Sequence, residues 1–234
     1  MTYETDLAYC HDTIKHGSLS FHAASKLLPR DVRDSSLALY AFCRVADDEV
    51  DLKQDKVTAV QTLIDRVDCV YRGHPRNHPT DRAFAHIVER HDMPRALPEA
   101  LLEGLAWDAM GHRYDSLNDL YAYSARVASA VGVMMCRIMD VRDRDTLARA
   151  CDLGVAMQLT NIARDIGEDA LERRLYIPQN WFHENGLDPE EFLDNPQPRQ
   201  VIRHMARRLL RDADRLYIRS NSGIAHLPVR VRLA

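Results

Sequence analysis

Two pairs of aspartates, each spaced four residues apart, are the side chains of this sequence best suited to chemistry. Asp47 and Asp51 lie in "RVADDEVD" and Asp165 and Asp169 in "DIGED", and each pair closes a long segment with apolar residues at helical spacing. Residues four apart share one face of a helix, so each pair presents two carboxylates on the same side. The negative end of the helix dipole disfavours each such carboxylate by a few tenths to about 1 kcal/mol. A chain that does this twice needs a compensating cation.

Magnesium, with manganese as a substitute, is the cation that fits these pairs. It prefers oxygen and takes one or two carboxylates together with the oxygens of a phosphate. The sequence has no Glu-x-x-His pair, no His-Glu-x-x-His motif and no EF-hand calcium loop. Two facing pairs would hold a diphosphate through bridging metal and stabilise it as a leaving group, which indicates ionisation of an allylic diphosphate to a carbocation. The alternative is that both runs are solvated charged faces.

Helices are the elements that must position these pairs. Apolar residues recur at 3.6-residue spacing, period-2 alternation is absent, and Pro lies between segments or at their first positions. The pattern predicts an all-α protein with a looser stretch at 176–197. We expect helices near residues 3–15, 18–28, 31–52, 55–72, 80–91, 98–112, 117–139, 143–171 and 198–220.

The composition limits the class of protein. A chain of 234 residues, 46% hydrophobic and 28% charged, is expected to form a single domain over 1–234. A net charge of −4 gives no reason to expect nucleic acid as a partner. Five dispersed cysteines and an acidic, polar N-terminus indicate a reducing cytoplasm and no signal peptide. The oligomeric state is left open.

Five motifs make the chain resemble the squalene/phytoene synthase family, and most of all its bacterial phytoene synthases. The resemblance extends over almost the whole length and rests on the two aspartate motifs with their flanks. The motifs are "GSLSF" (17–21), "LYAFCRVADDEVD" (39–51), "YSARVASAVG" (123–132), "QLTNIARDIGED" (158–169) and "RRLYIP" (173–178).

This resemblance implies an all-α isoprenoid-synthase (class I terpenoid synthase) fold with a central cavity between the two aspartate helices. It implies head-to-head condensation of two geranylgeranyl diphosphates to phytoene through prephytoene diphosphate, the first committed step of carotenoid biosynthesis, with no need for NADPH. Squalene, presqualene diphosphate or hydroxysqualene formation from farnesyl diphosphate is the enzymatic alternative. A non-catalytic helical assembly factor that kept the fold is an alternative of another class.

Family roles carry over to the matching positions of this sequence. The resemblance implies that magnesium is held by Asp47, Asp51, Asn161, Asp165 and Asp169. It implies diphosphate or polar substrate contacts from Ser18, Ser20, Arg44, Gln158, Arg164, Arg174 and Tyr176. Tyr40 and Tyr217 match family tyrosines near the reacting centre, where a ring face stabilises positive charge.

The stretch "SARVASAVGVMM" allows two interpretations. Its small residues, Ala128, Ser129, Ala130 and Gly132, would leave room for a long prenyl tail or would let two helices pack closely. The larger apolar residues expected either to contact the tail or to belong to the core are Phe21, Val127, Val131 and Met134.

Two departures from the family pattern affect these expectations. Leu19 stands where many relatives carry a lysine, so Arg44, Arg164 and Arg174 must supply the positive charge. Relatives also continue into further helix beyond the residues that match "GIAHLPVRVRLA". The chain ending at Ala234 is therefore expected either to lack a C-terminal segment or to close its cavity differently.

The last predicted helix carries a row of arginines four residues apart, at 199, 203, 207, 211, 215 and 219. One interpretation is a solvated face paired with Asp212 and Asp214. The other is peripheral attraction to the anionic inner face of a membrane, at roughly 1 kcal/mol per basic residue.

Overall fold

The chain folds into helices, and no strand occurs among the residues that the computed structural model describes, which are 2–17, 19–52 and 55–232. The side chains of residues 16, 17, 19, 20 and 52 are also outside this description. The all-α prediction is therefore confirmed.

The helices of the first half of the chain are α1 (Tyr3–Gly17), α2 (Leu19–Ser25), α3 (Arg30–Leu52), α4 (Lys56–Tyr71), α5 (Pro79–His91) and α6 (Ala96–Ala109). The second half contains α7 (Leu117–Ser124), the π-helical segment η1 (Ala125–Ser129), α8 (Ala130–Ile138), α9 (Arg144–Leu171), α10 (Gln179–Glu184), α11 (Pro189–Asp194), α12 (Gln200–Ile224) and the 3-10 turn η2 (Val229–Val231). The predicted ranges agree with these bounds to within a few residues.

Two features differ from the expected pattern. The single helix predicted at 117–139 is interrupted by η1, and the stretch at 176–197 contains α10 and α11. These two helices have six residues each, too few to show a helical period, and burial of Trp181, Phe182 and Phe192 holds them in place.

Side-chain caps mark several helix starts. Ser116 and Asp119 form a capping box at α7, in which the Ser116 hydroxyl accepts from the Asp119 backbone and the Asp119 carboxylate accepts from the Ser116 backbone. Asp143 accepts from the Thr146 amide at 2.9 Å at the start of α9. Each cap satisfies a backbone N–H that has no partner within its helix.

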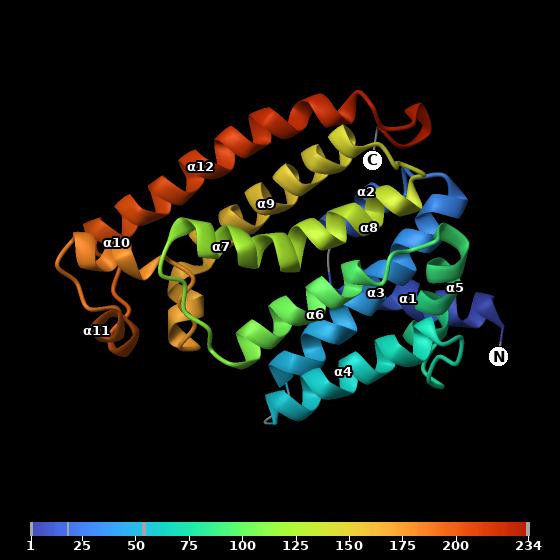
Figure 1. Ribbon diagram of the computed structural model, residues 1–234, viewed down its shortest axis with the longest axis horizontal. Helices are drawn as coiled ribbons and strands as arrows, with labels where there is room; N and C mark the ends of the chain where they lie inside the picture. The colour runs from blue at the N-terminus through green and yellow to red at the C-terminus, as the bar shows by residue number, and fades with distance from the viewer. Residues whose placement is uncertain (1, 18, 53–54, 233–234) are drawn as a thin grey trace.

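In Figure 1, α12 and α9 run side by side along one edge, and the rod of α7, η1 and α8 crosses the middle. Beyond the rod lie α6, α3 and α4, while α10 and α11 lie at the end of the molecule opposite the N-terminus. No helix in the described part of the chain combines the length and apolar character that a membrane span requires.

The buried apolar residues form two separate clusters. The first core is built from α1, α3, α4, α5, α6 and α8, and the second from α7, α9, α10, α11 and α12. Val127 in η1 is half-buried and packs against both cores. The first acid pair therefore belongs to a helix of one core and the second pair to a helix of the other.

A residue with left-handed backbone conformation follows the end of α9. Arg173 has a φ of 58°, which costs a residue with a Cβ roughly 1–2 kcal/mol. Its guanidinium binds Asp194 at 2.8 Å and Glu190 at 3.0 Å, both on α11. These contacts attach the turn after α9 to the short helices that follow it.

Candidate active site

The first acid pair occupies the last two turns of α3. The apolar residues on the other side of this helix, Leu39, Phe42, Ala46 and Val50, are buried in the first core and fix its orientation. Arg44 lies one turn before the pair, where its guanidinium is 3.8 Å from Asp47 and 2.7 Å from Asp48.

One turn further back on α3, Tyr40 makes an aromatic contact with α2. The Tyr40 ring stacks on Phe21 with a centroid distance of 5.5 Å. Tyr40, Arg44 and the first acid pair follow one another at spacings of three and four residues, so they share one face of α3. Ser18 and Ser20 of "GSLSF" were expected to contact the substrate. Ser18 and the side chain of Ser20 lie outside the described residues.

The second acid pair occupies the last turns of α9, directly before the helix ends at Leu171. Arg164 binds Asp165 through both Nε and Nη2, each at 2.7 Å. Gln158 and Asn161 are half-buried on the same face of α9 as the two aspartates. The second acid pair therefore ends a polar face of α9.

Arg174 brings the two pairs together. Its Nη2 donates to Asp51 Oδ1 at 2.5 Å, and its backbone N–H donates to the Asp169 carbonyl at 2.8 Å. A single residue therefore contacts the ends of both acidic helices, although Asp51 and Arg174 are 123 positions apart. The ends of the two acidic helices therefore lie next to each other, as a shared site requires.

Asp108, near the end of α6, is a site residue that the sequence analysis missed. It accepts from the Tyr123 hydroxyl at 2.7 Å and from the Tyr176 hydroxyl at 2.8 Å. The two phenol rings stack at 5.2 Å. Burial raises the pKa of the Asp108 carboxyl against the opposing effect of these two hydrogen bonds and of Arg174. The only signal in the sequence is a lone carboxylate near the end of an otherwise apolar helix.

The acid pairs are electrostatically crowded. Burial, followed by the neighbouring Asp51, raises the pKa of Asp47 from 3.8 to about 6, against the effect of Arg44. Burial and Asp165 raise the pKa of Asp169 to about 7, against the effect of Arg174. The negative charge of Asp108 contributes to both shifts, so this residue lies within electrostatic reach of both pairs. The Asp47 side chain is still 47% exposed, which describes an open and only partly desolvated cleft.

These carboxylates fit a divalent cation that arrives together with a substrate. Within the described part of the chain, no three His, Cys, Asp or Glu side chains are grouped closely enough to hold a metal ion by themselves. A pair of carboxylates that completes its shell with phosphate oxygens is the arrangement that magnesium accepts. The pKa values of Asp47 and Asp169 stay raised because burial and the neighbouring aspartates outweigh the opposing effects of Arg44 and Arg174.

The other predicted residues fall into two groups. Tyr176 belongs to the site through Asp108, whereas the Tyr217 hydroxyl lies 3.2 Å from Thr160, on another face of α9 from the acid pair. The role of Tyr217 at the reacting centre stays a prediction. Val131 is half-buried against the first core and Met134 is fully buried, so Met134 belongs to the core.

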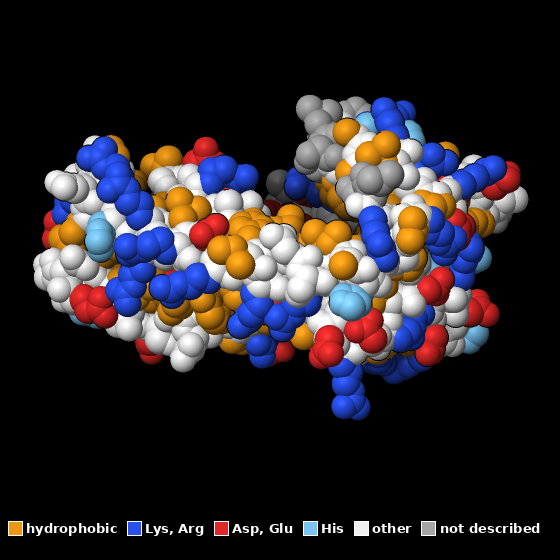
Figure 2. Space-filling view, turned by 90° about the horizontal axis from the view of Figure 1, so that it is seen from above, with side chains coloured by type: hydrophobic (Ala, Val, Ile, Leu, Met, Phe, Trp, Pro, Cys, Tyr) orange, Lys and Arg blue, Asp and Glu red, His pale blue; other side chains and the backbone are white. Residues whose placement is uncertain are grey.

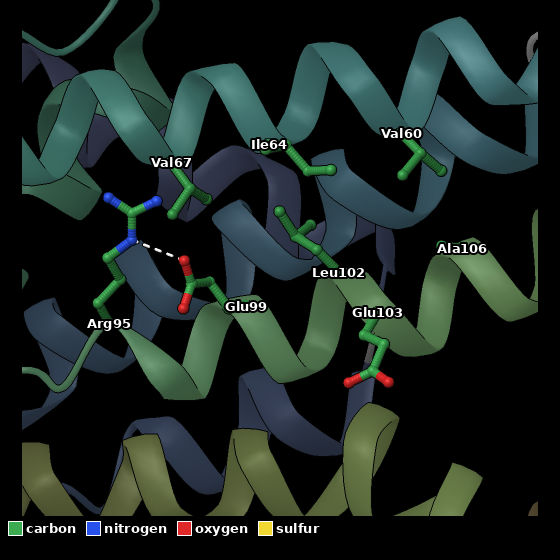
Figure 3. Close-up of a pocket in the computed structure, with 8 residues that line it drawn as sticks. All are labelled: Val60, Ile64, Val67, Arg95, Glu99, Leu102, Glu103 and Ala106. Carbon is green, nitrogen blue, oxygen red and sulfur yellow. Dashed lines mark hydrogen bonds and ion pairs between the residues drawn. The ribbon is translucent and has the colours of Figure 1, made fainter.

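The surface offers grooves that are distinct from this site. Figure 3 shows one of about 330 Å³ between α4 and α6, lined by Val60, Ile64 and Val67 on one side and Leu102 and Ala106 on the other. These α6 residues lie on the helix face opposite Asp108. The groove is therefore not part of the acid site.

A helical fold with two aspartate pairs around one arginine defines the isoprenoid-synthase class. The family model described as squalene/phytoene synthase matches residues 14–234. A phytoene synthase of Rhodobacter capsulatus is 58% identical over 99% of this chain and 69% of its own length. One of Cereibacter sphaeroides is 59% identical over 99% of this chain and 68% of its own length. A crystal structure of a dehydrosqualene synthase with ligand superposes with a TM-score of 0.89, 31% identity and coverage of 98% of this chain and 80% of that one.

The chain belongs to the squalene/phytoene synthase family. Both the family and the fold expected from the motifs are confirmed.

Proposed function

We propose that this chain catalyses the head-to-head condensation of two geranylgeranyl diphosphates to phytoene through prephytoene diphosphate. The observation that carries the proposal is the contact from Arg174 to Asp51, which joins both aspartate pairs in one site of a chain 58% identical to a phytoene synthase. Farnesyl diphosphate as substrate, and a non-catalytic role, have less support, because relatives that are 58% and 59% identical to this chain are phytoene synthases.

Asp47, Asp51, Asp165 and Asp169, with Asn161, would hold magnesium, with manganese as a substitute. The metal would supply electrostatic stabilisation of the departing diphosphate. In this structure Arg164 binds Asp165 and Arg174 binds Asp51. Arg44 binds the adjacent Asp48 and lies 3.8 Å from Asp47. Their guanidinium groups are positioned to exchange those carboxylates for diphosphate oxygens, which accept the same bidentate geometry.

The reacting carbons need a lining of low polarity that tolerates positive charge. The stacked rings of Phe21 and Tyr40 and the half-buried Val127 and Val131 would line the path of the prenyl chains. Exclusion of water by these side chains protects an allylic cation from capture. The Tyr123 and Tyr176 hydroxyls both donate hydrogen bonds to the Asp108 carboxylate. These bonds fix the orientation of both phenols near the acid pairs.

Product analysis tests this function. The purified chain is incubated with geranylgeranyl or farnesyl diphosphate, with and without NADPH, and the lipid extract is analysed by mass spectrometry. We expect phytoene from geranylgeranyl diphosphate with magnesium, independent of NADPH. Removal of metal with EDTA is expected to abolish turnover, and magnesium or manganese to restore it. Squalene formed only with NADPH contradicts the assignment, and the absence of both turnover and metal-dependent binding of a diphosphate analogue supports the assembly-factor alternative.

We also propose that the chain is cytoplasmic and meets the membrane through α12. Part of the arginine row is paired, since Arg215 binds Asp212 at 3.1 Å and Arg199 binds Glu191 at 3.4 Å. Arg203, Arg207 and Arg211 are exposed and form no ion pair within the described part of the chain. Figure 2, which looks down onto α12, shows basic side chains over this face of the molecule.

Co-sedimentation with vesicles tests the membrane contact. We expect binding to vesicles that contain phosphatidylglycerol and not to pure phosphatidylcholine. The double variant Arg207→Ala/Arg211→Ala should bind roughly 30-fold more weakly, from about 1 kcal/mol for each arginine. Equal binding of this variant and the unmodified chain contradicts the role of α12.

A further inference from the structure

The π-helical segment η1 lies between the two parts of the active site. It continues α7, which carries Tyr123, and it packs against α6 on one side and α9 on the other. Hydrogen bonds in a π-helix run from residue i to i−5, as from the Ala130 amide to the Ala125 carbonyl. Such segments are rare and occur frequently at functional sites.

On the α6 side, η1 is tied closely to the helix that carries Asp108. The Arg126 guanidinium lies 4.3 Å over the Trp107 ring and binds Glu103 at 3.0 Å. Gly104 lies under the same segment, where a Cβ would meet Val127 Cγ1 at 2.5 Å. The bond between Tyr123 and Asp108 thus belongs to a unit in which η1 and α6 hold each other in place.

On the α9 side, the contact is between backbones. A Cβ on Gly154 would lie 2.6 Å from Ser129 Cα, 2.7 Å from Ser129 N and 2.9 Å from the Ala128 carbonyl carbon. The Ser129 hydroxyl donates to the Cys151 carbonyl at 2.7 Å. The small residues of this stretch therefore serve close helix packing, one of the two interpretations of the sequence.

Gly154 also lies on the catalytic face of α9. The positions 154, 158, 161, 165 and 169 follow one another at spacings of four, three, four and four, so they form one stripe along the helix. The helix face that rests on η1 at Gly154 is the face that carries Asp165 and Asp169. The close contact at Gly154 and the second acid pair thus share one face of the same helix.

We propose that Gly154 is a positioning residue that sets the distance between the second aspartate pair on α9 and the Asp108–Tyr123 unit by letting α9 rest directly on the backbone of η1. The inference rests on the proposed function for its consequence in catalysis. A Cβ at this position meets backbone atoms, which cannot rotate away as a flexible side chain can. To restore ordinary contact distances, α9 must move by about 1 Å.

A displacement of this size is large for catalysis and small for folding. A misplacement of about 1 Å costs roughly 100-fold in rate when a reaction depends on orientation. Gly to Ala inside a helix also gains up to about 1 kcal/mol of helix propensity, which offsets part of the packing cost. The expected result is a folded protein whose catalytic groups are misaligned.

Gly154→Ala and Gly167→Ala make a matched test. Gly167 is on the same helix, and a Cβ there meets no atom within 4 Å. We expect kcat of Gly154→Ala to fall roughly 100-fold with KM changed less than about threefold, and α9 to be displaced from η1 in its crystal structure. Gly167→Ala should keep the unmodified kcat. Unchanged kcat in Gly154→Ala, or a lower kcat with α9 in its original place, overturns the proposal.

A second variant covers the case in which Gly154→Ala does not fold. Ser129→Ala removes the bond to the Cys151 carbonyl without adding an atom, and kcat should fall several-fold with KM unchanged. An unaltered kcat in Ser129→Ala then overturns the proposal. If the unmodified chain makes no phytoene, the proposed function fails on its own. The crystal structure of Gly154→Ala, or of Ser129→Ala if the former does not fold, then decides the positioning role by whether α9 shifts.

Discussion

At the scale of single residues, the site is a set of acids held apart by arginines. Arg44, Arg164 and Arg174 each contact one carboxylate of the two pairs, and Asp108 adds a further negative charge within electrostatic reach of both pairs. The carboxylates of Asp47 and Asp169 nevertheless keep raised pKa values. Raised carboxyl pKa values of this kind are common at functional sites.

Removal of one aspartate from either pair tests its part in ionisation. Asp47→Ala or Asp165→Ala is expected to lower turnover by roughly 100-fold or more, because the diphosphate loses electrostatic stabilisation. Circular dichroism should show nearly unchanged helical content, since both side chains lie outside the apolar cores. The control is Asp145→Ala in the exposed first turn of α9. An unaltered rate in either site variant removes that aspartate from the mechanism.

Asp169→Asn should stabilise the metal-free protein while it inactivates it. The folded protein raises the pKa of Asp169 to about 7 from 3.8, so the ionised form is penalised above pH 7. We expect the variant to gain roughly 1–2 kcal/mol in free energy of unfolding at pH 8, after allowance for solvent screening. The gain should shrink as the pH falls through 7 and vanish below about 4, where Asp169 is protonated in both states. Urea unfolding of the variant and the unmodified chain at pH 8 and pH 4, in EDTA, measures this gain in free energy of unfolding. An equal gain at both pH values would show that it does not come from the charge of Asp169.

At the scale of the elements, local sequence and tertiary packing decide different features. Capping residues at Ser116 and Asp143 and the apolar stripe of α3 are visible in the sequence, which is why most helix ranges could be predicted. The interruption by η1 was not visible, because "SARVASAVG" carries no local signal for a π turn. Gly154, which makes room for that turn, lies 25 or more positions further along the chain.

The capping box of α7 provides an element-scale prediction. Ser116→Ala removes the acceptor for the Asp119 amide and is expected to cost about 1 kcal/mol of stability. Thermal unfolding measures the loss. The control is Ser222→Ala on the exposed side of α12, where the hydroxyl donates only to the Arg219 carbonyl of the same helix, and it should change stability by no more than about 0.5 kcal/mol. Equal effects of the two substitutions would mean that the capping box does not stabilise α7.

The active site, like the helices, was predictable only where its residues follow a pattern within one element. The two acid pairs stand out because each repeats the helical spacing within one element. Asp108 does not, since its partners Tyr123 and Tyr176 come from 15 and 68 positions away and meet it only after α6 and α7 have packed. The contact from Arg174 to Asp51 likewise depends on the turn at Arg173 and on the packing of both cores.

At the scale of the whole molecule, the site lies on the seam between two cores. The helices of the first core supply Asp47, Asp51 and Asp108, those of the second supply Asp165 and Asp169, and Val127 packs against both cores. A ligand that bridges the acid pairs therefore links the two cores as well.

This arrangement predicts mutual stabilisation by metal and diphosphate. Magnesium with a non-reactive thiodiphosphate analogue of geranylgeranyl diphosphate, at about 100 times its Kd, should stabilise the fold by about 2.7 kcal/mol. Either component alone should give much less, because magnesium completes its shell with phosphate oxygens. Differential scanning fluorimetry measures the shift in Tm. Equal shifts with the analogue alone and with both components contradict a joint site.

The order of the site residues along the chain has a consequence for protein synthesis. When the nascent chain has emerged from the ribosome up to the end of α8, it contains the first acid pair, Asp108 and Tyr123. Asp165 and Arg174 have not yet emerged. The nascent polypeptide therefore cannot assemble the complete diphosphate site. On the proposed function, an allylic cation can therefore form only after translation has passed α9 and Arg174.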